Sequence, residues 1–418
     1  MVPTDARTTP EIIEFASQPT TSSGYPILGA VERWLNNCSW QELLAWFATT
    51  SFVLDLAFMT TSHRNVTSVY RAASESLLRG DTPYPPAAES IMGFLYLPGF
   101  AVAFSPFALL PPWFGDAIWK TTGLMLLVYA AWSNCRDLDH KLRIRVVLLA
   151  FALAAPLVVG NFVNGQANIH LAAACWLATL GAFRRQPVAV LLWTGVAILA
   201  KPLAIVMALL IAGLKPRMIP AVAGGIAWAV ALPFAVVEPH RTLILYQDFW
   251  QIMAPMSLSQ GFVATDFTAA LSNLGWTLEP SVKTVVRIAA AAASWAIALW
   301  LCYQLPRNAA ALAVMMIGTT YMCLFNPRAE GITYALLALP IAIAISMHLH
   351  EVRSRAWWIM TAAILVMAGS NGLTSKLFHL TEYWFKPTLI AVLLATMAIA
   401  VTKTWSNDPL SKRLFDIA

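Results

Sequence analysis

The chain has 418 residues, of which 59% are hydrophobic and only 11% are charged. An ordinary globular domain carries about 25% charged residues, so this composition excludes a water-soluble globule of the same length. The formal net charge is +6, but the basic residues lie in short clusters between apolar segments. That pattern is typical of charges that orient membrane helices, and it argues against nucleic acid as a partner.

The N-terminal segment, residues 1–40, is polar and mixed in charge and lacks the order of a removable signal peptide. The five cysteines have neither CxxC nor disulfide-framework spacing, and the outer loops predicted below contain no acidic DxD pair. We therefore expect no metal and no cofactor. The cysteines are Cys38, Cys135, Cys175, Cys302 and Cys323.

Apolar segments predict an all-α, polytopic transmembrane bundle over residues 41–403, followed by a cytoplasmic tail, 404–418. A helix that crosses the hydrocarbon layer needs roughly 20 mostly apolar residues, or about 17 for a short span. About twelve segments qualify by this rule. Residues 187–214 could also form one long helix, broken where Pro202 removes a backbone donor. The spans are expected near 41–61, 115–133, 146–160, 166–183, 187–200, 202–214, 218–237, 284–304, 309–325, 331–349, 356–371 and 387–403.

The apolar segment 96–112 contains four prolines, so we predict a re-entrant or interfacial segment rather than a span. The basic residues then sort into two sets, with most of them in short loops and the tail on one side. The positive-inside rule assigns that side to the cytoplasm, with both termini cytoplasmic. The cytoplasmic set is Arg136, Lys141, Arg143, Arg145, Arg184, Arg185, Lys215, Arg217, Arg307, Arg353, Arg355, Lys403, Lys412 and Arg413.

The opposite, outer side receives the long loops 62–95 and 238–283 and short loops at 161–166, 326–331 and 372–386. The cytoplasmic loops are too short to build a site, so chemistry is expected on a substrate in or above the outer leaflet. Within the first long loop, residues 70–79 read as an amphipathic helix lying on the membrane.

Several polar residues near this side are candidates for a site, because polar groups in hydrocarbon usually face a cavity or a partner. Asp55 lies in the first span, where pairing with Arg64 is the structural alternative. The fourth span opens with Asn164, Gln166 and Asn168. A helix N-terminus rich in donors suits a phosphate or sugar hydroxyls, although capping explains part of the pattern.

Two further candidates carry charge. Lys201 is a compact cation at the predicted outer end of a helix, where it would face a phosphate or snorkel to the headgroups. Arg328 and Glu330 lie on a tight turn between two spans. Arginine suits bidentate phosphate binding, and a mutual Arg–Glu pair is the structural alternative.

The ordered motifs of the chain resemble glycosyltransferase family 87, which comprises bacterial membrane mannosyltransferases of the GT-C architecture. The resemblance covers most of residues 41–350. Its motifs are Tyr70-Arg-Ala-Ala, Leu77-Leu-Arg-Gly-Asp-Thr-Pro-Tyr84, Tyr96-Leu-Pro-Gly-Phe, Pro106-Phe-Ala-Leu-Leu-Pro111, Trp119, Asn164-Gly-Gln-Ala-Asn168, Lys201-Pro202 and Asn326-Pro-Arg.

The resemblance implies inverting transfer of a hexose, typically mannose, from a polyprenyl-phosphate carrier to a lipid or glycan acceptor on the outer side. By position, Lys201 and Arg328 would face the carrier phosphate. Asn164, Gln166 and Asn168 would line the sugar or carrier, and we add Arg64, Tyr70 and Tyr96 to the substrate-binding candidates. Such a reaction needs a base for the acceptor's proton and cations for the leaving phosphate.

The chain departs from the family pattern at the position of the catalytic base. The usual catalytic aspartate lies about four residues before the tyrosine matched by Tyr70, where this chain has Arg64-Asn-Val-Thr67. A histidine common after the Asn-Pro element is also missing. Either another carboxylate serves as the base, with Asp55, Asp81, Asp266 and Glu330 as the candidates, or the chain belongs to a divergent branch of the family with different chemistry.

Two other functions stay open at this point. An O-antigen polymerase or ligase also combines about a dozen spans with one long outer loop. A secondary transporter would show related halves with broken helices, whereas this sequence has one clear break, at Lys201-Pro202.

Overall fold

The computed structural model describes residues 38–58, 65–84, 93–256, 265–327, 329–349, 355–369 and 382–407. The predictions for residues 1–37 and 408–418 and for Arg64 and Arg328 lie outside these ranges. By contacts the chain divides into Met1–Ser39 and Trp40–Ala418, and the helices below belong to the second unit. All regular structure in the described ranges is helical, which confirms the predicted all-α fold.

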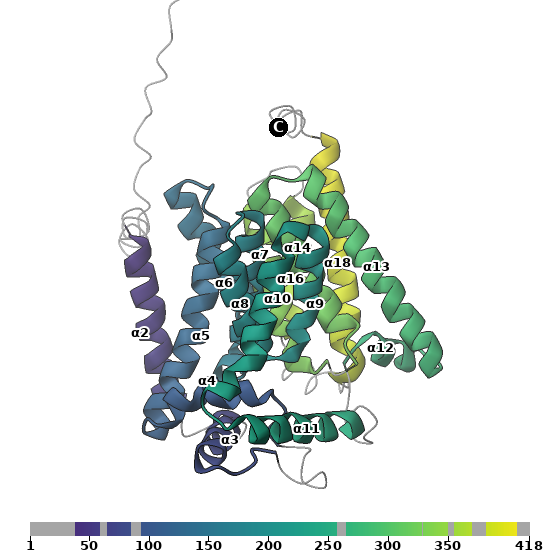
Figure 1. Ribbon diagram of the computed structural model, residues 1–418. Coiled ribbons are helices and arrows are strands. Elements are labelled where there is room, and N and C mark those ends of the chain that lie inside the picture. Colours follow the sequence, from purple (N-terminus) through teal and green to yellow (C-terminus); the bar gives the residue numbers. More distant parts are fainter. Residues whose placement is uncertain are drawn as a thin grey trace, which may run out of the picture. The chain divides into compact units, whose positions relative to one another are not determined.

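Every predicted span coincides with a helix or with a helix and its adjoining 3₁₀ turn (Figure 1). The helices are α2 (Trp40–Phe58), α3 (Thr67–Arg79), α4 (Pro98–Ala108), α5 (Pro112–Asn134), α6 (His140–Val163), α7 (Asn168–Phe183), α8 (Pro187–Ala200), α9 (Ile205–Leu214), α10 (Ile219–Ala231), α11 (Pro239–Met256), α12 (Phe267–Asn273), α13 (Pro280–Gln304), α14 (Arg307–Leu324), α15 (Ala335–His348), α16 (Arg355–Gly369) and α18 (Glu382–Asn407). The 3₁₀ turns are η2 (Pro202–Ala204), η3 (Pro216–Met218), η4 (Leu232–Ala235) and η5 (Gly331–Tyr334).

Length and hydropathy qualify five of the described helical segments as membrane spans. These are His140–Val163, Pro216–Ala235, Pro280–Gln304, Gly331–His348 and Phe385–Lys403. Further apolar helices, such as α7 and α8, are shorter than 18 residues. The chain is thus a helical membrane protein, and the count of about twelve spans stays a prediction.

The break at Lys201-Pro202 separates two helices, α8 and α9, that run in opposite directions. Proline occupies the first position of η2, where its missing N–H costs no helical hydrogen bond. Val190, near the start of α8, and Ile211, near the end of α9, belong to one buried apolar cluster. The alternative of a single long helix over residues 187–214 is therefore wrong.

Burial separates the centre of the bundle from its lipid-facing side. Every residue of α7 is buried, as is α15 from Ala335 to Ser346, which is the pattern of helices surrounded by other helices. Helix α13, at the right of Figure 1, has a single buried residue, Ala298, and exposes large apolar side chains along its length. Such exposure suits lipid as the surrounding solvent.

At one end of the bundle, short helices replace spans. Helix α4 has 11 residues, or about 16 Å at the helical rise, which is too short to cross the hydrocarbon, in agreement with the interfacial prediction for residues 96–112. The predicted amphipathic helix is present as α3. Helix α11 lies across this end beside α3 (Figure 1), and the Thr82 hydroxyl donates to Asp248 of α11 at 2.9 Å.

Candidate functional site

Tyr70 anchors α3 to the end of the bundle where the predicted outer loops meet. Its side chain is 1% exposed, and its hydroxyl lies 2.7 Å from that of Tyr96. The ring packs edge-on against Phe100 and Trp119. The Tyr70 hydroxyl also accepts a hydrogen bond from the Ala167 N–H at 3.4 Å. Tyr70 and Tyr96 thus fix α3 and the segment before α4 against the turn between α6 and α7.

That turn is the Asn164-Gly-Gln-Ala-Asn168 motif, and its shape depends on Gly165. Gly165 has a φ of +65°, and a Cβ there would lie 2.4 Å from the Thr67 side chain. Only glycine combines this backbone conformation with so close an approach of α3. The Asn164 carbonyl accepts from the Val66 N–H at 3.0 Å, so the motif is a docking point for the start of α3.

The asparagines near this turn connect three segments. Asn161 lies in the last turn of α6. Its side-chain NH₂ donates to the Ile332 carbonyl at 2.9 Å, and its Oδ1 accepts from Asn168 at 2.9 Å. Asn168 is fully buried, and its Oδ1 has no partner among the described residues. Gln166 is half-buried beside them.

The turn that carries Glu330 is held from several sides. Glu330 begins η5 in a capping box with Thr333, in which each side chain accepts from the other residue's backbone N–H. Lys386 of α18 donates to the Gly331 carbonyl at 2.7 Å. The Thr265 N–H donates to the Ala329 carbonyl, also at 2.7 Å. These anchors fix the backbone that follows residue 328.

Charges from separate segments meet at this end. Burial raises the pKa of the Tyr70 and Tyr96 hydroxyls, and the negative charge of Glu330 raises both further. Burial lowers the pKa of Lys201, and the attraction of Glu330 opposes that shift. Lys201 follows α8 and Glu330 follows α14, so tertiary structure brings an exposed carboxylate within electrostatic reach of a half-buried cation.

Sequence reasoning overlooked Asp116 and Lys120, although both lie within the predicted span 115–133. Asp116 is 8% exposed, and its Oδ2 accepts from the Asn65 side chain at 3.1 Å and from the Thr67 hydroxyl. Its Oδ1 lies 3.3 Å from Arg71. Asp116 therefore places a carboxylate beside residues 65–67, the stretch in which the family's aspartate is missing.

The other candidate carboxylates lie in different surroundings. Asp266 is fully buried, caps α12 and pairs with Arg287 at 3.1 Å, so all its oxygens have partners. Asp81 is 68% exposed at its side chain and lies 3.5 Å from Arg79. Asp55 is on α2, and its side chain lies outside the described part of the structure. Within the described ranges, no group of three His, Cys, Asp or Glu side chains could hold a metal ion.

Comparison with known proteins gives one match. The family model for glycosyltransferase family 87 matches residues 94–327, which is more than half of the chain. No curated protein and no solved structure matches the sequence. The family match supports transferase activity over the transporter alternative. With its apolar helices and exposed apolar α13, the chain is a membrane glycosyltransferase that belongs to glycosyltransferase family 87.

Proposed function

We propose that the protein transfers a hexose from a polyprenyl-phosphate carrier to a lipid or glycan acceptor at the outer face of the plasma membrane. The hexose that we propose is mannose. The observation that carries the proposal is the match to glycosyltransferase family 87 over residues 94–327. It is supported by the nearby Glu330 carboxylate, which raises the pKa of Lys201 against the lowering by burial, at the end of the bundle that the basic loops predict to be outside. A lipid-linked donor matches a site whose walls are the ends of apolar helices.

In the proposed reaction, an acceptor hydroxyl oxygen attacks the anomeric carbon of the sugar from the side opposite the carrier. The new C–O bond forms as the bond to the carrier phosphate breaks, which inverts the anomeric configuration. The Glu330 carboxylate takes the hydroxyl proton, and the released polyprenyl phosphate carries the additional negative charge. Lys201 and Arg328 stabilise that charge, the task for which fixed cations are most effective.

Glu330 is our choice among the four candidate bases because it is exposed and acts electrostatically on Lys201, the cation that we assign to the carrier phosphate. The partners of Asp266 occupy both of its oxygens, and Asp81 faces the solvent beside Arg79. Tyr70 and Tyr96 act in this proposal as positioning residues, since their buried hydroxyls bond each other. Asn164, Gln166 and Asn168 shape the turn next to which the sugar would lie.

The direct test is incubation of membranes that contain the protein with labelled polyprenyl-phosphate mannose. We expect label to pass to an endogenous lipid or glycan, with inverted anomeric configuration in the product. Polyprenyl-phosphate glucose and a nucleotide-linked mannose, supplied in parallel, separate the choice of sugar from the choice of carrier. Transfer from the nucleotide sugar in membranes depleted of polyprenyl phosphate would refute the lipid-linked donor.

A further inference from the structure

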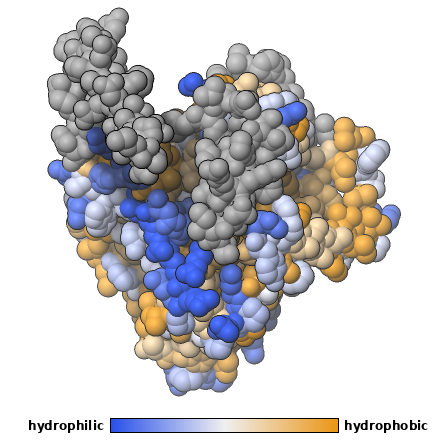
Figure 2. Space-filling view, turned by 90° about the horizontal axis from the view of Figure 1, so that it is seen from above, coloured by the Kyte–Doolittle hydropathy of each residue, from blue (hydrophilic) through white to orange (hydrophobic). Residues whose placement is uncertain are grey.

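Two pockets lie at the opposite end of the bundle, where α7 ends, and both are lined by basic residues. Figure 2 looks down on this end and shows hydrophilic residues gathered in a band across it. The arginine pocket, of about 200 Å³, is lined by Trp40, Tyr129, Trp132, Ser133, Arg136, Arg143 and Arg184. The lysine–arginine pocket has a volume of about 410 Å³. It is lined by Arg185, Lys215, Arg217 and Arg307 and by mainly apolar residues of α7, α9, α13 and α14.

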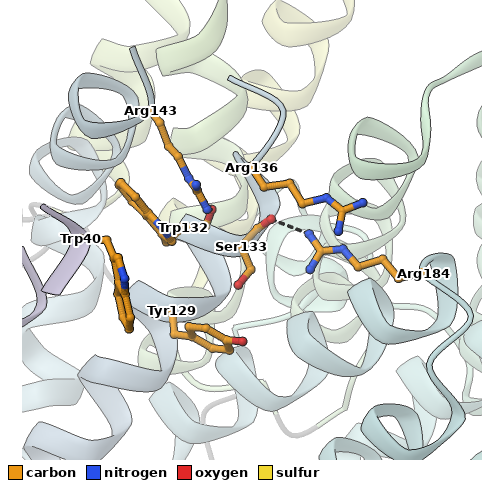
Figure 3. Close-up of a pocket in the computed structure, with 7 residues that line it drawn as sticks. All are labelled: Trp40, Tyr129, Trp132, Ser133, Arg136, Arg143 and Arg184. Carbon is orange, nitrogen blue, oxygen red and sulfur yellow. Dashed lines mark hydrogen bonds between the residues drawn. The ribbon is translucent and has the colours of Figure 1, made fainter. Parts of the chain in front are cut away.

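In the arginine pocket, two guanidinium groups form hydrogen bonds to other residues of the protein (Figure 3). Arg143 donates twice to the Trp132 carbonyl, at 2.9 and 2.6 Å, and stacks on the Trp132 ring. Arg184 donates to the Ser133 carbonyl and, at 3.1 Å, to Asn308. These bonds satisfy carbonyls at the end of α5, which have no helical partner. Arg143 and Arg184 therefore have a structural role.

The lysine–arginine pocket differs because its cations have no such partners. No carboxylate lines it, and within the described residues none of its four basic side chains forms a hydrogen bond or an ion pair. Lys215 lies over the Phe183 ring, 4.2 Å from the ring centre. Four cations around one cavity that no carboxylate of the described residues lines favour an anion as its occupant.

The backbone at Arg185 is a second and independent indication of a ligand. Arg185 has a φ of 58° and is the one non-glycine residue with a positive φ in the described ranges. The Gln186 N–H bonds the Gly181 carbonyl and the Arg185 N–H bonds the Ala182 carbonyl, which makes Arg185 the left-handed residue of a Schellman motif. Glycine is favoured there, and an L-residue costs about 1–2 kcal/mol. An arginine kept at that cost indicates a role for its side chain.

Size and surroundings indicate which anion fits. The cavity volume lies within the range of about 300–1,000 Å³ that is usual for small-molecule sites, so it accommodates more than a bare ion. Its walls below the cations are apolar, with Phe183, Leu214 and Leu305 among them. Next to it, α13 exposes Trp300 and Tyr303, the residue types that mark the headgroup level of a membrane.

We propose that the lysine–arginine pocket binds the phosphate of an anionic phospholipid headgroup from the leaflet opposite the transfer site. Arg185, Lys215, Arg217 and Arg307 surround the phosphate, and the apolar walls receive the start of the acyl chains. Basic pockets between membrane helices are suited to such headgroups. This inference is independent of the sugar and donor proposed above.

The test uses the purified full-length protein in a neutral detergent and measures the rise in unfolding temperature on titration with phosphatidylglycerol. Phosphatidylcholine with the same acyl chains and inorganic phosphate are titrated in parallel. We expect phosphatidylglycerol to stabilise the protein and the other two to have little effect. Full stabilisation by phosphatidylcholine, or by inorganic phosphate alone, would overturn the assignment to an anionic lipid.

The decisive variant is Arg185→Gly, because its two expected effects have opposite signs. It removes one cation, which weakens phosphatidylglycerol binding about fivefold, and it relieves the left-handed backbone, so the lipid-free protein keeps or raises its unfolding temperature. Lys215→Gln combined with Arg307→Gln should weaken binding about 25-fold on the same scale. Unchanged binding in both variants would refute the proposal.

The matched control is Lys141→Gln combined with Lys403→Gln, which removes two exposed cations of the same predicted side that line neither pocket. We expect this variant to bind phosphatidylglycerol like the wild type. An equal loss in the control would mean that total charge, and not the pocket, determines binding.

Discussion

The two ends of the bundle handle polar side chains in opposite ways. At the end that carries Tyr70, polar groups are buried and bonded to one another, as in the Asn161–Asn168–Ile332 connection. At the end that carries Arg185, the four cations of the lysine–arginine pocket surround a cavity and form no hydrogen bond or ion pair with the described residues. The first arrangement fixes a geometry, whereas the second leaves charge that a ligand would compensate. The following predictions, from the largest expected effect to the smallest, test this difference.

Glu330→Gln should reduce sugar transfer by about 10²–10⁴-fold, the usual contribution of a general base. Glutamine can keep the capping-box acceptor, so the turn at η5 should fold normally. Initial rates with labelled polyprenyl-phosphate mannose give the measurement. Glu75→Gln, on exposed α3 surface, is the matched control and should retain activity. Equal activity in the two variants would remove Glu330 from the mechanism.

Lys201→Met should reduce transfer by about 10²–10³-fold, because a fixed charge that stabilises the leaving phosphate is lost. Methionine preserves most of the apolar stem, which limits the effect on packing. Lys283→Met, a basic residue at the start of α13, serves as control. If the Lys201 variant keeps full activity while its unfolding temperature falls, the lysine is structural and the transfer site lies elsewhere.

Arg143→Met should destabilise the protein by about 1–3 kcal/mol, because the Trp132 carbonyl loses its charged donor. Thermal unfolding in detergent measures this loss, and phosphatidylglycerol binding should be retained. The variant therefore contrasts with Arg185→Gly, for which we expect weaker lipid binding and no loss of stability. If Arg143→Met weakened lipid binding and Arg185→Gly destabilised the protein, the roles that we assign to the two pockets would be exchanged.

Tyr70→Phe should have the smallest effect, about 1–2 kcal/mol of stability, since it removes the bond to the Tyr96 hydroxyl and the longer bond from the Ala167 N–H but leaves the ring packing intact. The free energy of unfolding is the measurement, with transfer rates recorded alongside. A drop in rate of more than tenfold without a change in stability would instead show that the Tyr70 hydroxyl contacts the substrate.

The chain's own residue pattern determined the helices. Apolar runs predicted a helix at each expected span, and prolines such as Pro187 and Pro280 mark where helices begin, because proline fits the first helical turn and disrupts later ones. The short α4 likewise follows from the prolines of segment 96–112. These features depend on neighbours in sequence, so the sequence alone is sufficient to predict them.

Tertiary structure decided which polar residues meet. Asp116 lies beside Asn65 and Thr67, and Lys201 lies within reach of Glu330, because helices far apart in the chain pack together. No local pattern encodes such contacts, which is why four carboxylates remained open. Asp116 could have been selected from the sequence as a carboxylate inside the predicted span 115–133, but its partners could not. The same holds for the lysine–arginine pocket. The positive-inside rule gives those cations a common side of the membrane, but only the packing of α7, α9 and α14 gives them a common cavity.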